Sequence, residues 1–217
     1  SKEIWEEEIL YFDADLLMGL KYFKEKDFSN AEKHFLRLNS FTKYNLFFDD
    51  FLGNVLISWV KVSKNDMEGA FKYLEKIPER YRKLKKIQNA FLQCYFDTEQ
   101  SELSFNQLID NEEYSSRYSF FLINYLLHKN KNTKAEEIIK KGREEYSANL
   151  LIKQSEDFVL KNKHEKIKKI FNCKDTNDSI AEILYVMANI YTANENYQLS
   201  NFYLNLSFYF NNKFCKC

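Results

Sequence analysis

The chain has 217 residues, a length that fits one or two globular domains or a single array of repeats. Lys and Arg total 32 and Asp and Glu total 32, and this balance argues against a nucleic-acid binder that relies on phosphate contacts. One proline and four glycines argue against a β-sandwich or barrel, because those folds need many tight turns. The 17% of aromatic residues is expected to build the core.

The cysteines and the apolar segments indicate the cellular compartment of the chain and whether it crosses a membrane. Its four cysteines, Cys94, Cys173, Cys215 and Cys217, are fewer than a secreted disulfide scaffold of this length would carry, so a reducing, cytoplasmic compartment is expected. No apolar run reaches the roughly 18 residues of a membrane-spanning helix. The first ten residues lack the basic and apolar regions of a signal peptide, so none is expected there.

The first strong pattern in the chain lies at 16–38, after a predicted helix at 1–12 that caps or precedes it. It contains Gly19, Tyr22, Phe28, Ala31 and Phe35. Small residues at 19 and 31 let two antiparallel helix backbones approach, and the aromatic residues fill the space around that crossing. The polar residues 24–27 are the predicted turn between the two helices.

The same pattern recurs along the rest of the chain. The positions equivalent to Gly19 are 58, 92, 123, 155 and 188, at steps of 39, 34, 31, 32 and 33 residues. This regular spacing predicts six repeats, at 12–45, 51–80, 81–111, 116–146, 149–173 and 179–210. Leu92, Ile123 and Ile167 occupy positions that should be small, so the third to fifth repeats are expected to be irregular.

These residue types and offsets resemble the tetratricopeptide repeat (TPR), a helix–turn–helix unit of about 34 residues. The resemblance covers nearly the whole chain and implies an all-α fold, a right-handed superhelix of antiparallel helix pairs forming one domain over 1–217. The chain also resembles segments of long TPR-rich proteins of alphaproteobacteria, which have no assigned activity. TPR domains that capture chaperone tails use a Lys/Asn and Lys/Arg clamp, but Leu16, Leu20 and Leu56 occupy the matching positions here.

The sequence contains no motif for catalysis, cofactors or metal ions. His34, His128 and His164 are scattered, and the glycines stand alone rather than in a phosphate-binding loop. Cys215 and Cys217 form a single CxC without a second pair of ligands. We therefore predict that the chain is not an enzyme and that it binds neither a cofactor nor a metal.

The resemblance implies that the first helices of the repeats line a concave groove. An extended peptide or a helix would be held there by side-chain amides and apolar pockets. The predicted peptide-binding residues are Asn89, Gln93, Asn124, Asn189, Trp59, Phe120 and Tyr185. Asn124 and Asn189 are the preferred ligand contacts, whereas packing inside the core is the favoured role for Trp59.

The last predicted helix is too apolar to face water on all sides. Its aromatic residues predict self-association, as a two-fold homodimer, through Phe202, Tyr209, Phe210 and Phe214. The preferred function is therefore a protein–protein interaction scaffold with a protein or peptide partner, without nucleic-acid binding or membrane insertion. Two alternatives stay open: a structural or self-association segment of a longer repeat protein, and an accessory domain of an enzyme encoded outside this segment.

Overall fold

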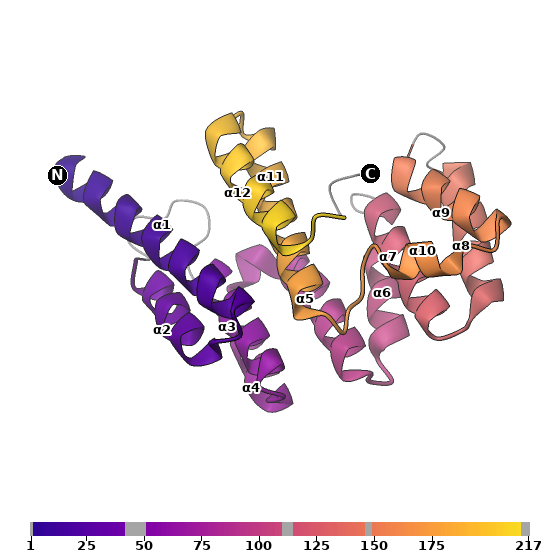
Figure 1. Cartoon of the computed structure of the whole chain (residues 1–217), viewed down its shortest axis with the longest axis horizontal. Helices are drawn as coiled ribbons and strands as arrows, with labels where there is room; N and C mark the ends of the chain where they lie inside the picture. Colours follow the sequence, from indigo (N-terminus) through magenta and orange to yellow (C-terminus); the bar gives the residue numbers. More distant parts are fainter. Residues whose placement is uncertain (1, 42–50, 110–114, 146–148, 214–217) are drawn as a thin grey trace. The chain divides into compact units, whose positions relative to one another are not determined.

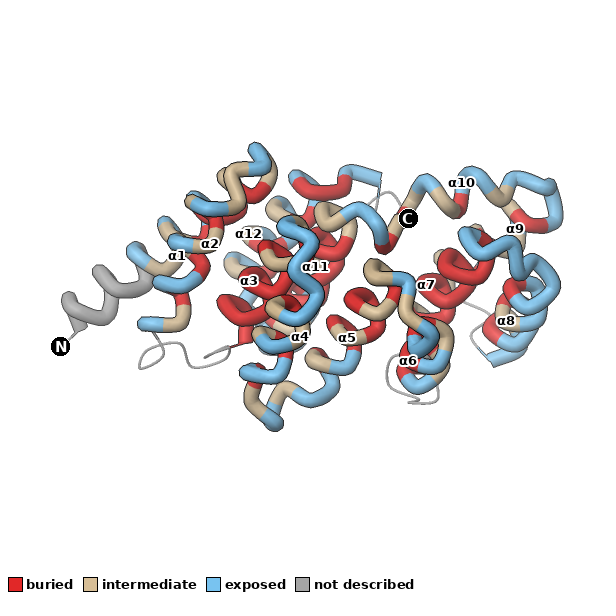
Figure 2. Tube along the Cα trace, turned by 90° about the horizontal axis from the view of Figure 1, so that it is seen from below, coloured by how far each residue is buried: buried red, intermediate tan, exposed pale blue. Residues whose placement is uncertain are grey.

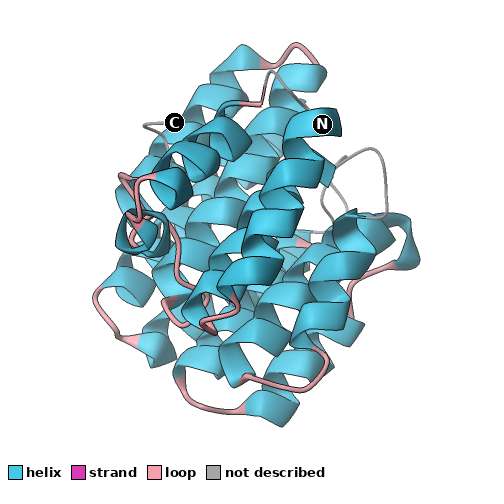
Figure 3. Cartoon of the chain, turned by 90° about the vertical axis from the view of Figure 1, so that its right-hand side faces the viewer, coloured by secondary structure: helices cyan, strands magenta, loops and turns pink. Residues whose placement is uncertain are grey.

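A computed structural model describes residues 2–41, 51–109, 115–145 and 149–213. Over these ranges the chain is all-helical, with twelve α-helices, two short 3-10 helices and no strand (Figure 1; Figure 3). This confirms the predicted all-α class. The right-handed superhelical arrangement of the helix pairs stays a prediction. Phe214, Cys215 and Cys217 lie outside the described residues.

The chain divides into two compact units, Ser1–Leu92 and Gln93–Cys217. The division falls inside one helix, α5, so this helix contributes residues to both units. The first contains α1 (Lys2–Lys24), α2 (Phe28–Leu38), η1 (Asn39–Phe41), α3 (Leu52–Ser63), α4 (Met67–Glu75), η2 (Glu79–Tyr81) and most of α5 (Arg82–Phe96). The second contains the end of α5, α6 (Ser101–Ile109), α7 (Ser115–His128), α8 (Asn132–Glu145), α9 (Leu150–Leu160), α10 (His164–Lys168), α11 (Thr176–Ala193) and α12 (Tyr197–Phe210).

Consecutive helices pack in pairs in both units. In the first unit α1 packs on α2 and α3 packs on α4, while α2 also contacts α3. In the second unit α7 packs on α8, α9 on α10 and α11 on α12. The division of the chain into six repeats stays a prediction.

The turn inside each pair has the same backbone feature. One residue other than glycine adopts a positive φ between 52° and 64° in each of the six turns that precede α2, α4, α6, α8, α10 and α12. These residues are Lys26, Asn65, Asp97, Asn130, Asn162 and Glu195. Lys26 lies within the turn predicted at 24–27, and each of the other five residues precedes the second helix of its pair.

Small residues bring the paired helices close together where the pattern predicts. A Cβ at Gly19 in α1 would lie 2.3 Å from the ring of Phe35 in α2, so only glycine fits there. In the second pair the hydroxyl of Ser58 donates to the carbonyl oxygen of Ala70 at 2.8 Å. In the last pair a similar bond lies outside the predicted positions, since the Ser207 hydroxyl donates to the carbonyl oxygen of Ala181 at 2.7 Å.

The fifth pair, α9 and α10, is irregular because its second helix is short. α10 has only five residues, and it contacts α7 as well as α9. Ile167 of α10 is fully buried. Figure 2 shows the resulting contrast between α7, which is mostly buried, and α10, which is mostly exposed or half-buried.

Among the described helices, none is both long and apolar enough to cross a membrane.

Candidate functional site

The structure corrects the predicted roles of three groove residues. Trp59, Phe120 and Asn124 are at most 2% exposed, so a peptide cannot reach their side chains. The Trp59 indole donates to Gln88 Oε1 at 2.8 Å, which confirms the alternative that this residue packs in the core. The Asn124 amide donates to the carbonyl oxygen of Ile167 at 3.0 Å and so holds α10 on α7.

The other four predicted groove residues do not form one site. Asn89 lies in the first unit and Gln93 in the second, and both are half-buried on α5. Asn189 is exposed on α11, and its amide donates to the carbonyl oxygen of Tyr185 at 3.1 Å. Tyr185 and Asn189 are therefore neighbours along α11, and a groove that joins all seven residues stays a prediction.

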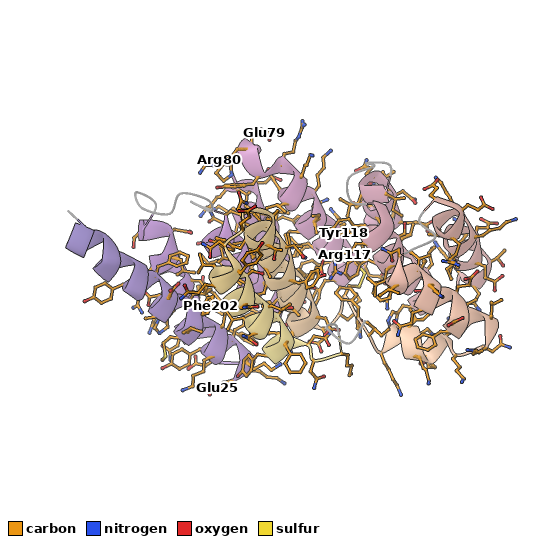
Figure 4. All side chains as sticks on the ribbon, turned by 90° about the horizontal axis from the view of Figure 1, so that it is seen from above. Glu25, Glu79, Arg80, Arg117, Tyr118 and Phe202 are labelled. Atoms are coloured by element: carbon orange, nitrogen blue, oxygen red, sulfur yellow. A yellow bond between two sulfur atoms is a disulfide. The ribbon has the colours of Figure 1, made fainter. Side chains whose placement is uncertain are left out.

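A buried ion pair lies beside Tyr185. The Arg117 guanidinium donates twice to the carboxylate of Glu182, at 2.8 and 2.5 Å, and its centre lies 3.9 Å from the middle of the Tyr185 ring (Arg117 and Tyr118 are labelled in Figure 4). Glu182 is fully buried, and this burial raises its pKa although the Arg117 guanidinium opposes the rise. The two charges are paired with each other, and the pair links α7 to α11.

The described residues contain no cluster of three or more His, Cys, Asp or Glu that would hold a metal ion. His34 lies in the first unit, and His128 and His164 lie in the second. His34 Nδ1 lies 2.7 Å from Asp15 Oδ1, in a contact between α2 and α1. At His128, burial is the main cause of a lowered pKa.

The structure contains a disulfide that the sequence does not predict. Cys94, near the end of α5, forms a disulfide with Cys173, which follows α10. Their separation of 79 residues carries no recognisable spacing signal, and the small number of cysteines had instead favoured reduced thiols. Both residues are buried, so the link is internal to the second unit.

The most distinctive surface belongs to α12. Tyr203 and Phe210 point into the packing, where the Tyr203 ring stacks on Tyr191 with centroids 5.3 Å apart. The opposite stripe is open to solvent, and we call it the α12 outer face. It consists of Tyr197, Asn201, Leu204, Asn205, Phe208 and Tyr209.

The predicted self-association residues divide between these two sides of α12. Tyr209 is 52% exposed and belongs to the outer face. Phe202 is half-buried, with its ring edge against Tyr203 (labelled in Figure 4). Phe210 is only 5% exposed, so the structure corrects its predicted role from contact residue to core residue.

The α12 outer face carries no charge, unlike helix α8 of the same unit. No residue of α12 carries a charge, whereas α8 in the same unit has acidic and basic residues over most of its length. Three of the outer-face residues, Tyr197, Phe208 and Tyr209, are aromatic and between 46% and 63% exposed. Exposed aromatic side chains with depleted charge are typical of protein interfaces. The sequence predicts this helix as an interface, but among the residues of the outer face it names only Tyr209.

Comparisons of this chain with family models, curated proteins and solved structures give no match.

Proposed function

We propose that this chain is a protein–protein interaction scaffold, built as a TPR-like array of helix pairs, and that it contacts its partner through the α12 outer face. The observation that carries the proposal is that face itself. It places aromatic and amide side chains in water on a helix without a single charge. On this proposal the chain performs no catalysis of its own.

Physical chemistry favours covering such a surface. Full burial of one large apolar side chain contributes about 1.5–3 kcal/mol, and the face has four that are at least 37% exposed: Tyr197, Leu204, Phe208 and Tyr209. The asparagines Asn201 and Asn205 supply hydrogen-bond donors and acceptors between them. A partner helix with an apolar stripe and polar edges matches this arrangement.

The proposal predicts a complex that depends on the α12 outer face. The full chain would be isolated from its native cells under mild conditions, and the size of its complex would be measured by gel filtration. Leu204→Glu is expected to release the chain from the complex, because it places a charge at the centre of an apolar contact. A matched control, Leu103→Glu, changes a leucine that is 52% exposed on α6 beside the ion-paired Glu102. Equal behaviour of the two variants would remove the assignment to α12.

Self-association is the second candidate, and the neutrality of the face favours it. Two copies of a charge-free face meet without like-charge repulsion, and two-fold contacts are the commonest closed arrangement. Sedimentation of the purified chain over a concentration series is expected to show a dimer that Leu204→Glu dissociates. A monomer at every concentration would leave only a different protein as partner.

A further inference from the structure

A hollow of about 500 Å³ lies on the second unit, between α9, α10 and the turn that joins them. We call it the lysine hollow, and it is lined by Leu150, Lys153, Gln154, Asp157, Phe158, Lys161, Lys163 and Lys166. Sites for small molecules usually occupy about 300–1,000 Å³, so the hollow has the size of a ligand site.

The hollow holds an unbalanced positive charge. Four lysines face one aspartate, which leaves an excess of three positive charges in a chain whose total charge is zero. Some lysines elsewhere in the chain are paired with carboxylates, as Lys61 and Lys64 are with Glu32, at 2.6 Å each. None of the four hollow lysines forms an ion pair with any carboxylate in the part of the chain that the structure describes.

The nearby carboxylates are already engaged elsewhere. Glu156, next to Asp157 in the sequence, accepts from Arg143 of α8 at 2.9 Å. Glu165 of α10 accepts from Lys168 at 2.9 Å. Asp157 is therefore the one lining residue whose negative charge would repel an anion bound in the hollow.

The local backbone brings the lysines together. Asn162 adopts a positive φ of 52°, and the Lys163 amide donates to the carbonyl oxygen of Phe158 at 2.7 Å, which closes the turn between α9 and α10. The turn therefore places Lys161 and Lys163 between the lysines of the two helices. The Lys166 ammonium lies 5.6 Å from the centre of the Phe158 ring, so one wall of the hollow is aromatic.

We propose that the lysine hollow binds a small ligand that carries two or more phosphate groups. Lysine ammonium groups are common phosphate ligands, and a group of two or more phosphates matches an excess of three positive charges better than a single carboxylate does. The size of the hollow and its closed turn favour a compact ligand over an extended nucleic-acid strand, which needs a longer basic stripe. This inference is independent of the α12 outer face.

Calorimetric titration of the full chain with inorganic triphosphate at low ionic strength tests the proposal. The double variant Lys163→Gln/Lys166→Gln is expected to weaken binding by about tenfold or more, because two of the four ammonium groups are lost. Asp157→Asn is expected to tighten binding, since it removes the one opposing charge. Lys141→Gln on α8 is the matched control, because Lys141 is 60% exposed outside the hollow, and it should leave binding unchanged.

Three further titrations define the ligand. Adenosine triphosphate binding more tightly than triphosphate would identify a nucleoside polyphosphate that uses Phe158, and equal binding would assign recognition to the phosphates alone. Adenosine by itself is expected not to bind. The proposal is overturned if triphosphate does not bind, if Lys141→Gln weakens binding as much as the double variant, or if a poly-glutamate peptide binds while triphosphate does not.

Discussion

Gly19 is the residue on which the packing of the first helix pair depends most directly. A methyl group there would lie 2.3 Å from Cε1 of Phe35, and the aromatic ring is fully buried and cannot easily move. Gly19→Ala is therefore expected to destabilise the fold by about 1–3 kcal/mol, although alanine ordinarily favours a helix interior by about 1 kcal/mol. Denaturant unfolding of the purified variant measures this change.

Two companion variants separate the steric effect from helix propensity. Gly142→Ala is a matched control, since its added methyl would meet Ile152 only at 3.3 Å, and its cost should be much smaller. Gly19→Ala/Phe35→Leu should recover part of the lost stability by vacating the ring position. Equal costs at both glycines would mean that the close approach of α1 and α2 does not limit this site.

The buried pair of Arg117 and Glu182 gives a pH-dependent prediction. Arg117→Met leaves Glu182 buried without its partner, so we expect a loss of about 3–5 kcal/mol in the free energy of unfolding near neutral pH. Burial already raises the pKa of Glu182, and removal of the guanidinium raises it further. Because the folded pKa then exceeds the unfolded one, the variant is most stable below about pH 4.5 and loses stability as pH rises through the folded pKa.

Unfolding curves of Arg117→Met at several pH values check this sign. The double variant Arg117→Met/Glu182→Leu serves as the control, since it has no carboxyl group to titrate at this site and should lose the extra pH dependence. A variant whose stability instead rises with pH over the same range would contradict the assignment of the effect to Glu182.

Among the helical elements, each of the six pairs has one residue with a positive φ in its internal turn. Lysine is poorly suited to that conformation, whereas asparagine tolerates it. Lys26 is exposed with φ at 64°, so Lys26→Gly is expected to stabilise the fold by up to about 1 kcal/mol. Asn65→Gly, at φ 58°, should gain less. Denaturation midpoints of the two variants measure which gains more stability. A larger gain for Asn65→Gly would contradict the explanation that lysine fits a positive φ worse than asparagine does.

The disulfide joins the end of α5 to the segment between α10 and α11. It closes a loop over a sequence separation of 79 residues, and links of this kind typically contribute about 2–4 kcal/mol. Cys94→Ser/Cys173→Ser is expected to lower the melting temperature of the chain, and a reducing agent should lower that of the wild type to a similar value. Alkylation of both thiols in the untreated, denatured protein would show instead that they are not linked.

Helix pairs, turns and crossings could be predicted because they depend on local periodicity and on residue size. Gly19, Ser58 and the polar turns carry that information in the sequence itself. The candidate site could be predicted only in part. Periodicity identifies the face of a helix on which Asn124 lies, but it does not reveal that α10 covers that face. The pairing of Cys94 with Cys173 depends on tertiary structure and left no local signal.

The whole molecule consists of two compact units, Ser1–Leu92 and Gln93–Cys217. The division at Leu92 and Gln93 lies inside the third predicted repeat, where a large residue replaces the small one. The single array over 1–217 stays a prediction. Both surfaces proposed for binding, the α12 outer face and the lysine hollow, lie on the second unit. They differ in chemistry, one being apolar and uncharged and the other basic, so they can be tested independently.

The central claim is that the α12 outer face contacts protein, and site-specific photo-crosslinking in native cells tests it most directly. A photoreactive benzophenone amino acid would replace Phe208, which is 46% exposed, and in a matched chain it would replace Leu103. We expect position 208 to form a discrete covalent product with one protein, either a second copy of this chain or a single partner, and Leu204→Glu to abolish it. No product at position 208, or the same products from positions 208 and 103, would contradict the claim.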